Sequence, residues 1–473
     1  MIRNLSLKSA VLAACVAALP AAAQTRAPAP AKALTFDVEV GLQGVAGYNA
    51  FWGLADVYAP AENYKEDSVW GEAYVEPGVT WRGDLGPDVR LRARASGVGS
   101  ITIGSDIFAS VDESSITLED AVIGLSAGDA AKGFQFDISG GSQPYRIGSG
   151  MLIADGGIDG FERGTLIFGP RQAWEVTGVV RASYKNVYAE GFHLDPRELG
   201  SGNTRTIIRG ARLEWTIAKD RFVGITYGHV PRSEAPYVQA APGGVGAPTV
   251  ILNGRDGMSF WHVYGNVAPF KTMPGLVVTW DYARQRNERL RMKANGGRIE
   301  ITNTFVTTKW LPTIGYGFQS FSGDDPDTPE LERFDPLFYD GSPGGWATGA
   351  SSAFVFINTN VQAHKLKLSA MPTQQDIVTF RYSHVRANQS RSPLQFGQAT
   401  RPDFGPGAPG LIAGVIQKHL ADDILLEYTH LVNQHIFVTG GFSHSWPGPG
   451  LQELAFGRAK QWTGGFVNVV FKY

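Results

Sequence analysis

Three arginines stand at alternate positions in one short stretch of the chain. Arg90, Arg92 and Arg94 are separated from one another by single apolar residues. Because successive side chains of a β-strand point to opposite faces, the three guanidinium groups are expected on one face, at successive levels. A guanidinium group stays charged and can bind a carboxylate through two parallel hydrogen bonds. The spacing therefore indicates a strand face that can hold carboxylate groups.

Further basic residues lie on the polar faces of other alternating segments and extend this candidate site: Arg181, Arg212, Lys365, Lys367 and Arg381. Two interpretations remain open. In the first, the cations form a ladder that selects anions, because low-dielectric walls focus their field. In the second, acidic residues on the same faces, such as Asp37, Asp137 and Glu427, neutralise them, and little selectivity remains.

An acidic stretch is the second candidate site, and its members are Asp324, Asp325, Asp327 and Asp335. The stretch is expected to be a solvated loop that partly gates an electropositive channel. Ca²⁺ binding is the alternative, because this ion takes several oxygen ligands, but the spacing lacks the glycine and terminal glutamate of an EF-hand loop. No other cofactor and no metal centre is expected.

Catalytic motifs are not found in the sequence. It has no Gly-x-Ser-x-Gly, His-Glu-x-x-His or phosphate-binding Gly-rich Lys motif. Four of the nine histidines lie in aromatic strand contexts, where anchoring at a membrane interface explains them: His262, His384, His430 and His444. Ser383 and His384 are adjacent and point to opposite faces of a strand, so they cannot act as a dyad. The sequence does not predict an enzyme.

Segments that alternate apolar and polar residues recur along the chain and position these candidates. They include residues 35–43, 89–96, 134–139, 174–181, 211–215, 223–229, 278–283, 365–370, 378–383 and 424–429. Alternation alone does not say which face is inside. The two chain ends and the lack of any helical stretch favour apolar faces directed outward, toward lipid, as in a transmembrane β-barrel.

The final residues read as the closing strand of such a barrel. Tyr473, Phe471, Val469 and Val467 fall on one face, and Lys472 falls on the other. This pattern resembles the aromatic-ended last strand of bacterial outer-membrane barrels. It is expected to pair with residues 35–43, because an open edge is not tolerated in lipid. The barrel-assembly machinery is the expected partner of this strand during insertion.

The first residues predict export. Residues 1–23 combine basic Arg3 and Lys8, an apolar core and a small-residue cleavage site at Ala23, as in a cleaved signal peptide. The single cysteine, Cys15, lies within this segment, so no disulfide is expected in the mature chain. Residues 24–33 read as a Pro/Ala linker. The expected location is the outer membrane of a Gram-negative bacterium.

Composition is consistent with one large barrel over residues 34–473. No run of 18 apolar residues follows the signal segment, and the net charge of −2 gives no indication of nucleic-acid binding. At roughly 25 residues per strand with its connection, the barrel would hold about 16 to 18 antiparallel strands around a water-filled lumen. Long loops, some of them folded inward, are expected near residues 231–257, 322–352 and 391–410.

Two segments resemble the alginate-export family of outer-membrane barrels. In the first, the matching residues are Gly323, Asp324, Asp325, Phe334, Leu337 and Phe338, with Tyr339 where the family often has proline. In the second, weaker match, the shared residues are Gln143, Tyr145, Gly148, Gly150 and Asp155. Ser142 replaces an arginine of the family there, which puts the identity of the substrate in question.

This resemblance implies an 18-stranded barrel that passes an anionic polysaccharide through an arginine-rich lumen. The function expected from the sequence is therefore a channel for anionic polysaccharide or sugar acids. A general diffusion porin for small solutes is the alternative. A surface barrel for adhesion or lipid chemistry is a third.

One basic run is not explained by these alternatives. Its members, at the end of a predicted strand, are Arg284, Arg286, Arg289, Arg291 and Lys293. Contact with lipopolysaccharide phosphate and simple solvation explain the run equally well at this stage. Outer-membrane lipid and lipopolysaccharide are accordingly among the expected partners.

Overall fold

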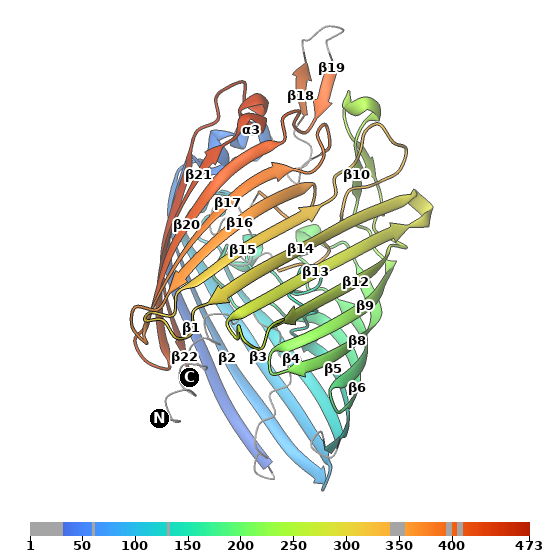
Figure 1. Ribbon diagram of the computed structural model, residues 1–473, viewed down its shortest axis with the longest axis vertical. Coiled ribbons are helices and arrows are strands. Elements are labelled where there is room, and N and C mark those ends of the chain that lie inside the picture. Colours follow the sequence, from blue (N-terminus) through green and yellow to red (C-terminus); the bar gives the residue numbers. More distant parts are fainter. Residues whose placement is uncertain (1–31, 59–61, 130–132, 341–354, 394–399, 404–409) are drawn as a thin grey trace.

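The computed structural model describes residues 32–58, 62–129, 133–340, 355–393, 400–403 and 410–473, and it shows one closed antiparallel β-barrel (Figure 1). The barrel strands are β1 (Lys32–Tyr48), β2 (Ser68–Gly86), β3 (Val89–Gly104), β4 (Ser114–Asp129), β5 (Phe134–Gln143), β6 (Trp174–Tyr184), β7 (Val187–Asp195), β8 (Ile207–Ala218), β9 (Arg221–Arg232), β12 (Ser259–Val267), β13 (Leu276–Asn287), β14 (Met292–Thr304), β15 (Thr313–Phe321), β16 (Val361–Ala370), β17 (Asp376–Ala387), β20 (His419–Leu431), β21 (Ile436–Pro447) and β22 (Trp462–Lys472). They form one 18-stranded sheet.

Closure joins the two ends of the described chain. β1 pairs with β22 in antiparallel register, with Val40 opposite Phe471. The backbone groups of Val38 and Tyr473 exchange two hydrogen bonds, of 3.1 and 2.9 Å. The ring therefore has no open edge, as lipid requires. The predicted fold, including a strand number within the expected range and the pairing of the last strand with residues 35–43, is confirmed.

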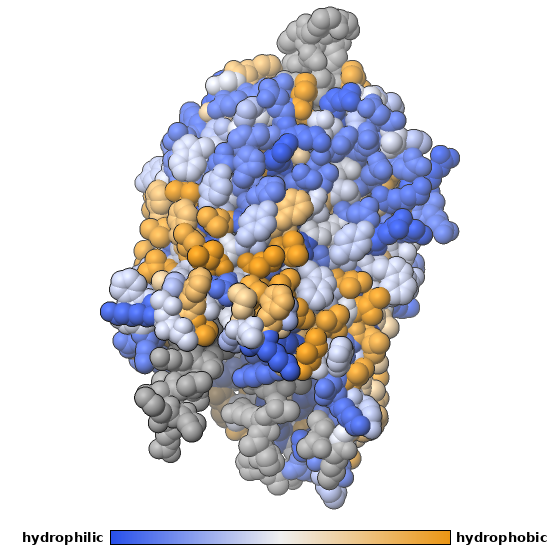
Figure 2. Space-filling view, viewed as in Figure 1, coloured by the Kyte–Doolittle hydropathy of each residue, from blue (hydrophilic) through white to orange (hydrophobic). Residues whose placement is uncertain are grey.

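The outer wall is apolar where the strands cross the membrane. Leu34 and Phe36 of β1 are 57% and 72% exposed on the outer face. The next residue, Asp37, points inward and accepts a hydrogen bond from Arg94. The same alternation places Leu366 and Leu368 of β16 on the outside. Figure 2 shows the resulting belt of hydrophobic side chains between two more hydrophilic ends. Apolar faces are thus directed outward.

The two ends of the barrel differ in the length of their connections. Short turns such as 87–88, 185–186 and 219–220 lie at one end, with the termini of the described chain (Figure 1). The opposite end carries connections 144–173, 233–258, 322–360 and 388–418, which include the hairpins β10 (Tyr237–Gln239)–β11 (Thr249–Ile251) and β18 (Thr400–Asp403)–β19 (Gly410–Ala413). Long connections face outward from the cell in bacterial barrels.

Helices are few among the described residues. They are α2 (Ala55–Tyr58), α3 (Pro449–Leu454) and single turns η1 (Ala50–Gly53), η3 (Phe161–Arg163), η4 (Gly200–Gly202), η5 (Pro242–Gly244) and η6 (Glu288–Leu290). In the part of the chain that the structure describes, each helix is too short to cross a bilayer. The predicted signal peptide and the first residues of the predicted linker lie outside the described residues, as do 341–354 and parts of 391–410.

A packed core lies inside the long-loop end rather than along the whole barrel. The rings of Trp52 and Trp462 meet edge to face with their centroids 5.2 Å apart, and the Phe356 ring packs against Trp52 at a tilt of 39°. Trp174, expected on the outer face, is fully buried there instead. Its ring packs against Phe338 and its indole N–H donates to the Tyr145 carbonyl at 3.0 Å, because the long connections cover the start of β6. This core holds the loops in the lumen.

Candidate functional site in the barrel interior

The connection between β5 and β6, residues 144–173 (the inner strap), crosses the interior of the barrel. On one side, the Arg298 guanidinium of β14 donates to the Ser149 carbonyl at 2.8 Å. On the other side, the Glu72 carboxylate of β2 accepts the backbone N–H groups of Leu166 and Phe168 at 3.1 and 2.9 Å. β2 and β14 lie on opposite sides of the closed ring. The inner strap therefore spans and narrows the lumen.

Buried carboxylates of the wall hold the strap by its backbone. Glu72 is 2% exposed and also accepts the Ile167 N–H at 3.3 Å. Glu119 of β4 accepts the N–H groups of Gln172 and Ala173, both at 2.7 Å. Charge-assisted hydrogen bonds to buried donors are among the stronger ones, and buried donors without a partner are costly. These glutamates were not among the sequence candidates, because nothing local in the sequence shows which backbone they face.

A second strap, residues 322–340, lies beside the first. The Ala154 N–H donates to the Phe338 carbonyl at 2.7 Å, and the Asp340 N–H donates to the Gly150 carbonyl at 2.8 Å. The Arg146 guanidinium donates to the Asp340 carboxylate at 2.8 Å and lies 3.9 Å from Asp155. The two straps are therefore joined by backbone and side-chain bonds and form one constriction.

Titratable carboxylates lie within this constriction. Burial and, to a lesser extent, the neighbouring Asp340 carboxylate raise the pKa of Asp155 to about 7, against the opposing effect of Arg146. Burial likewise raises the pKa of Asp159 to about 6, although Arg171 donates to it at 2.7 Å. Protonation of these strap carboxylates near neutral pH changes the charge of the constriction.

Two of the three arginines of β3 are already bound to carboxylates of the wall. Arg92 donates two hydrogen bonds to Asp137, one of them at 2.9 Å. Arg94 donates to Asp37 at 2.7 and 2.9 Å and to Asp120 at 2.5 Å. Arg90 lies at the short-turn end with a side chain 56% exposed. The three face inward, but the charges of Arg92 and Arg94 are compensated.

Arg181 and Arg212 share one acidic partner. Arg181 donates to Oε2 of Glu190 at 2.7 Å, and Arg212 donates to Oε1 at 2.6 Å. Tyr145 of the inner strap donates its hydroxyl to the same Oε1 at 2.7 Å, and the Tyr188 ring lies 5.2 Å from each guanidinium carbon. This cluster anchors the inner strap to β7 and β8. Its arginines therefore bind the carboxylate that holds the strap in place.

Lys365 and Lys367 differ from these arginines. Both face inward from β16, between outward Leu366 and Leu368. Within the described residues, neither lysine has a carboxylate within 4.0 Å or a hydrogen bond to another side chain. Gly317 of β15 lies beside Lys365, and a β-carbon there would stand 3.2 Å from the lysine Cε, so the stem lies flat on the wall.

Arg381 of β17 stands opposite Lys367 in register and lies 3.8 Å from Glu427. One nitrogen of its guanidinium group, Nη1, is buried without a hydrogen-bond partner in the described part of the chain. Glu300 occupies the register position of Lys365 two strands away. The wall of β16 and β17 thus presents cations that are less compensated than those of β3, β6 and β8.

The predicted acidic gate is partly buried rather than solvated. Asp324 accepts the N–H groups of Ala240 and Glu332 at 2.7 and 2.9 Å, and burial raises its pKa. Asp335 binds Arg255 through two hydrogen bonds of 2.8 and 3.0 Å. These hydrogen bonds hold the second strap to neighbouring segments, so the two carboxylates already have protein partners.

The two remaining acids of the predicted gate are less enclosed. Asp327 is exposed and lies 3.0 Å from Arg391, and Asp325 accepts the Asp327 N–H at 3.0 Å. A gating role for this loop, and the Ca²⁺ alternative, stay predictions.

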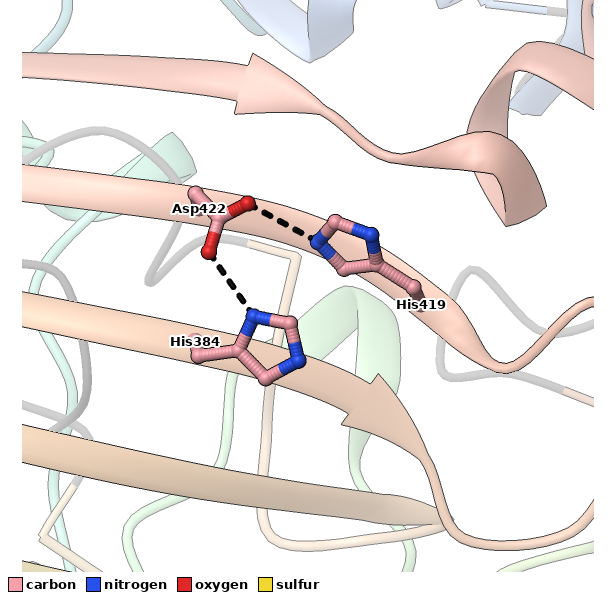
Figure 3. Close-up of side chains that lie close together, drawn as sticks. All are labelled: His384, His419 and Asp422. Carbon is pink, nitrogen blue, oxygen red and sulfur yellow. Dashed lines mark hydrogen bonds and ion pairs between the residues drawn. The ribbon is translucent and has the colours of Figure 1, made fainter.

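Histidines occupy both faces of the wall. His262, expected at the membrane interface, is instead 1% exposed inside the barrel, where its Nε2 lies 2.9 Å from Asp281. His384, His419 and Asp422 form the one group among the described residues whose atoms could converge on a metal ion (Figure 3). They lie on the outer wall, away from the lumen.

Hydrogen bonding explains this outer histidine cluster. Asp422 accepts the Tyr382 hydroxyl at 2.7 Å and lies 2.8 Å from His384 Nδ1 and 3.0 Å from His419 Nε2 (Figure 3). Asp376, at the other end of the same strand pair, contacts Tyr428 and His430 in the same way, both at 2.7 Å. A Tyr–Asp–His arrangement repeated at both ends of β17 and β20 is typical of interfacial anchoring.

Comparison with known proteins identifies solved structures that have a similar fold. No protein-family profile and no curated protein sequence matches this chain. Among solved structures, the Pseudomonas aeruginosa outer membrane protein OpdK superposes with a TM-score of 0.53 at 9% identity, over 93% of this chain and 98% of the other. P. aeruginosa OccK2 (OpdF) in complex with glucuronate gives 0.52 at 10% identity, over 93% and 96%. P. aeruginosa OpdK with vanillate gives 0.51 at 10% identity, over 93% and 98%.

This likeness shows the fold and no more. Together with the outward apolar belt, it places the chain among transmembrane β-barrels of the outer membrane, as expected. The resemblance to the alginate-export family gains no support, because the neighbours are Opd and Occ outer-membrane proteins. Passage of a polysaccharide is likewise unsupported.

Proposed function

We propose that this barrel is a diffusion channel of the outer membrane for small solutes, with carboxylate-bearing solutes such as sugar acids favoured. The observation that carries the proposal is the inner strap, which is bonded to opposite walls and to the second strap. A polymer would have to displace this bonded constriction, whereas a small solute needs a narrower opening. The small-solute alternative therefore fits better than polysaccharide export.

The preference for carboxylates rests on Lys365, Lys367 and Arg381. The two lysines face the lumen without a carboxylate within 4.0 Å in the described chain, and Arg381 stands across from Lys367. Cations on a low-dielectric wall raise the local concentration of anions. OccK2, a structural neighbour, has been solved with glucuronate, a sugar acid, which agrees with this class of solute.

The test is solute flux into liposomes that contain the purified barrel. Glucuronate and glucose are similar in size and differ in charge, so the change of their flux ratio in a variant measures charge preference. We expect the double substitution Lys365→Gln and Lys367→Gln to lower the glucuronate-to-glucose ratio about tenfold while glucose flux is unchanged. Arg92→Gln/Asp137→Asn is the matched control, because it removes a paired cation and carboxylate and leaves the net charge of the lumen unchanged.

Three outcomes would count against the proposal. Equal flux of glucuronate and glucose through the unmodified barrel would remove the carboxylate preference. Passage of long oligouronates at the rate of the monomer would favour the polysaccharide channel expected from sequence. Absence of flux for any small solute would contradict a diffusion channel.

A further inference from the structure

A row of basic side chains crosses the outer wall near its long-loop end. Strand register aligns the row across six neighbouring strands, from β7 to β14. Its basic members in order around the barrel are His193, Arg209, His229, Arg286 and Lys293, and Ser259 of β12 occupies the position between His229 and Arg286. Arg284 extends the row one step toward the membrane on β13. We refer to these residues as the basic row.

Strand alternation directs the basic row outward. The residues that follow or precede its members in sequence, such as Ile208, Val230 and Gln285, are fully buried on the inner face. Arg209, Arg286 and Lys293 are exposed. Figure 2 shows hydrophilic side chains over the outer ends of β13 and β14, with the hydrophobic belt below them. The row therefore faces the membrane surroundings rather than the lumen.

The side chains below the basic row change in the order expected at a membrane surface. One register step down, the rings of Tyr227 and Trp261 lie 5.0 Å apart. One step further, Ile225 and Val263 are 40% and 37% exposed on the outer wall. Aromatic residues with a polar tip sit at the headgroup level of a bilayer, and aliphatic ones sit in its hydrocarbon. The basic row thus stands at the level of lipid phosphates.

The two arginines on β13 lack compensation within the described chain. Arg284 and Arg286 have no hydrogen bond or ion pair there, although they project from the same face of one strand, roughly 7 Å apart. Lys293 has Glu330 at 3.6 Å, and Arg209 donates to His193 Nδ1 at 3.1 Å. Exposed Glu288 in the β13–β14 turn is the other acid of this hairpin end. Interior Arg92 and Arg94, by contrast, each have carboxylate partners.

We propose that the basic row binds the phosphate groups of a phosphorylated glycolipid in the outer leaflet, with Arg284 and Arg286 as the principal phosphate-binding residues. Guanidinium groups bind phosphate through paired hydrogen bonds and remain charged at every physiological pH. Positive side chains next to a membrane gain further from an anionic lipid surface. The ring pair of Tyr227 and Trp261 and the aliphatic belt below would contact the acyl chains of the same lipid.

The experiment measures retention of lipid A by the detergent-purified full-length barrel with native mass spectrometry. Bisphosphorylated and dephosphorylated lipid A are added separately at equal concentration. We expect the bisphosphorylated form to be retained at least tenfold better, and the variant Arg284→Gln/Arg286→Gln to lose this preference. The control variant Lys271→Gln/Lys309→Gln removes two exposed charges from the short-turn end and should retain it.

Equal retention of the two lipids, or unchanged preference in Arg284→Gln/Arg286→Gln, would overturn the proposal. If inorganic phosphate alone at millimolar concentration displaces the bound lipid, the site recognises free anions and the lipid assignment fails. Solute flux through Arg284→Gln/Arg286→Gln should match that of the unmodified barrel, which shows that the variant is folded. Because the row faces away from the lumen, failure of this proposal leaves the channel function untouched.

Discussion

Glu72 illustrates how one buried side chain can fix a loop of the lumen. Its carboxylate accepts three consecutive backbone N–H groups of the inner strap and the indole N–H of Trp70. A carboxylate offers several lone pairs in a small volume, which makes it suited to a turn of backbone donors. Because an unsatisfied buried donor costs free energy, this contact is expected to stabilise the position of the inner strap.

Substitution of this residue should release one end of the strap. We expect Glu72→Ala to lower the free energy of local opening at residues 166–168 by about 2–4 kcal/mol, because one buried and two partly buried N–H groups lose their acceptor. Hydrogen exchange of these amides measures the change. Glu72→Gln keeps one acceptor oxygen, so its free energy of local opening should lie between those of Glu72→Ala and the unmodified chain. Unchanged exchange in Glu72→Ala would show that the strap is held elsewhere.

The strap carboxylates predict a dependence on pH. The pKa of Asp155 is raised to about 7 by burial, so the folded strap binds this proton more tightly than the unfolded chain does. The stabilisation is therefore complete below the ordinary pKa of an aspartate and is lost as pH rises through about 7. Hydrogen exchange of residues 150–160, corrected for intrinsic rates, should show less protection at pH 8 than at pH 5.

Asp155→Asn provides the control for this pH effect. The amide cannot ionise, so protection of residues 150–160 should vary less between the two pH values, with the remainder due to Asp159, whose pKa is raised to about 6. A pH dependence equal to that of the unmodified chain would mean that Asp155 is not the group involved.

At the scale of elements, neighbouring residues of β22 lie in the two environments of the wall, the lipid outside and the lumen inside. Val467 is 60% exposed on the outer face, and Asn468 points inward, where its amide donates to Gln43 at 3.2 Å. We expect Val467→Arg to lower the free energy of unfolding in lipid vesicles by about 2–4 kcal/mol, because a charge then faces hydrocarbon. Asn468→Arg should cost much less. Urea titration measures both, and equal costs would contradict the assigned faces.

The two straps act as one element because their bonds connect distant parts of the chain. Arg146 and Asp340 are separated by 194 positions and lie 2.8 Å apart. Gly150 adopts φ of +82°, and a β-carbon there would stand 2.2 Å from the Arg146 guanidinium, so glycine permits this close contact. The constriction therefore depends on residues that neither strap could position alone.

For the whole molecule, the placement of cations that have no carboxylate within 4.0 Å in the described chain distinguishes the lumen from the outer wall. Lys365 and Lys367 face the lumen, whereas Arg284 and Arg286 are exposed on the outer face of the wall near its long-loop end. The lumen lysines should attract anionic solutes over a shorter distance at high salt, because the Debye length falls from about 10 Å at 0.1 M to about 3 Å at 1 M. We expect the glucuronate-to-glucose flux ratio to fall between these salt concentrations.

In the Lys365→Gln/Lys367→Gln barrel the same ratio should be low and nearly independent of salt. A strong salt dependence that persists without the lysines would assign the preference to other cations, of which Arg381 is the nearest in register.

The sequence by itself indicated the barrel and, together with the two chain ends, which face of most strands is directed outward. Alternation of Leu366 and Leu368 with Lys365 and Lys367 is a local pattern of period two, and local patterns can be read without knowing the fold. The aromatic-ended last strand likewise indicated closure onto residues 35–43, which the pairing of β1 with β22 confirms.

Only the tertiary structure decided which charges are available. Arg94 meets Asp37 across 57 positions, while Lys365, with the same alternation, meets no acid within 4.0 Å in the described chain. The interior position of His262 and the burial of Trp174 depend in the same way on distant segments. Strand register and loop placement set these contacts, and both follow from closure of the whole ring rather than from any local stretch of sequence.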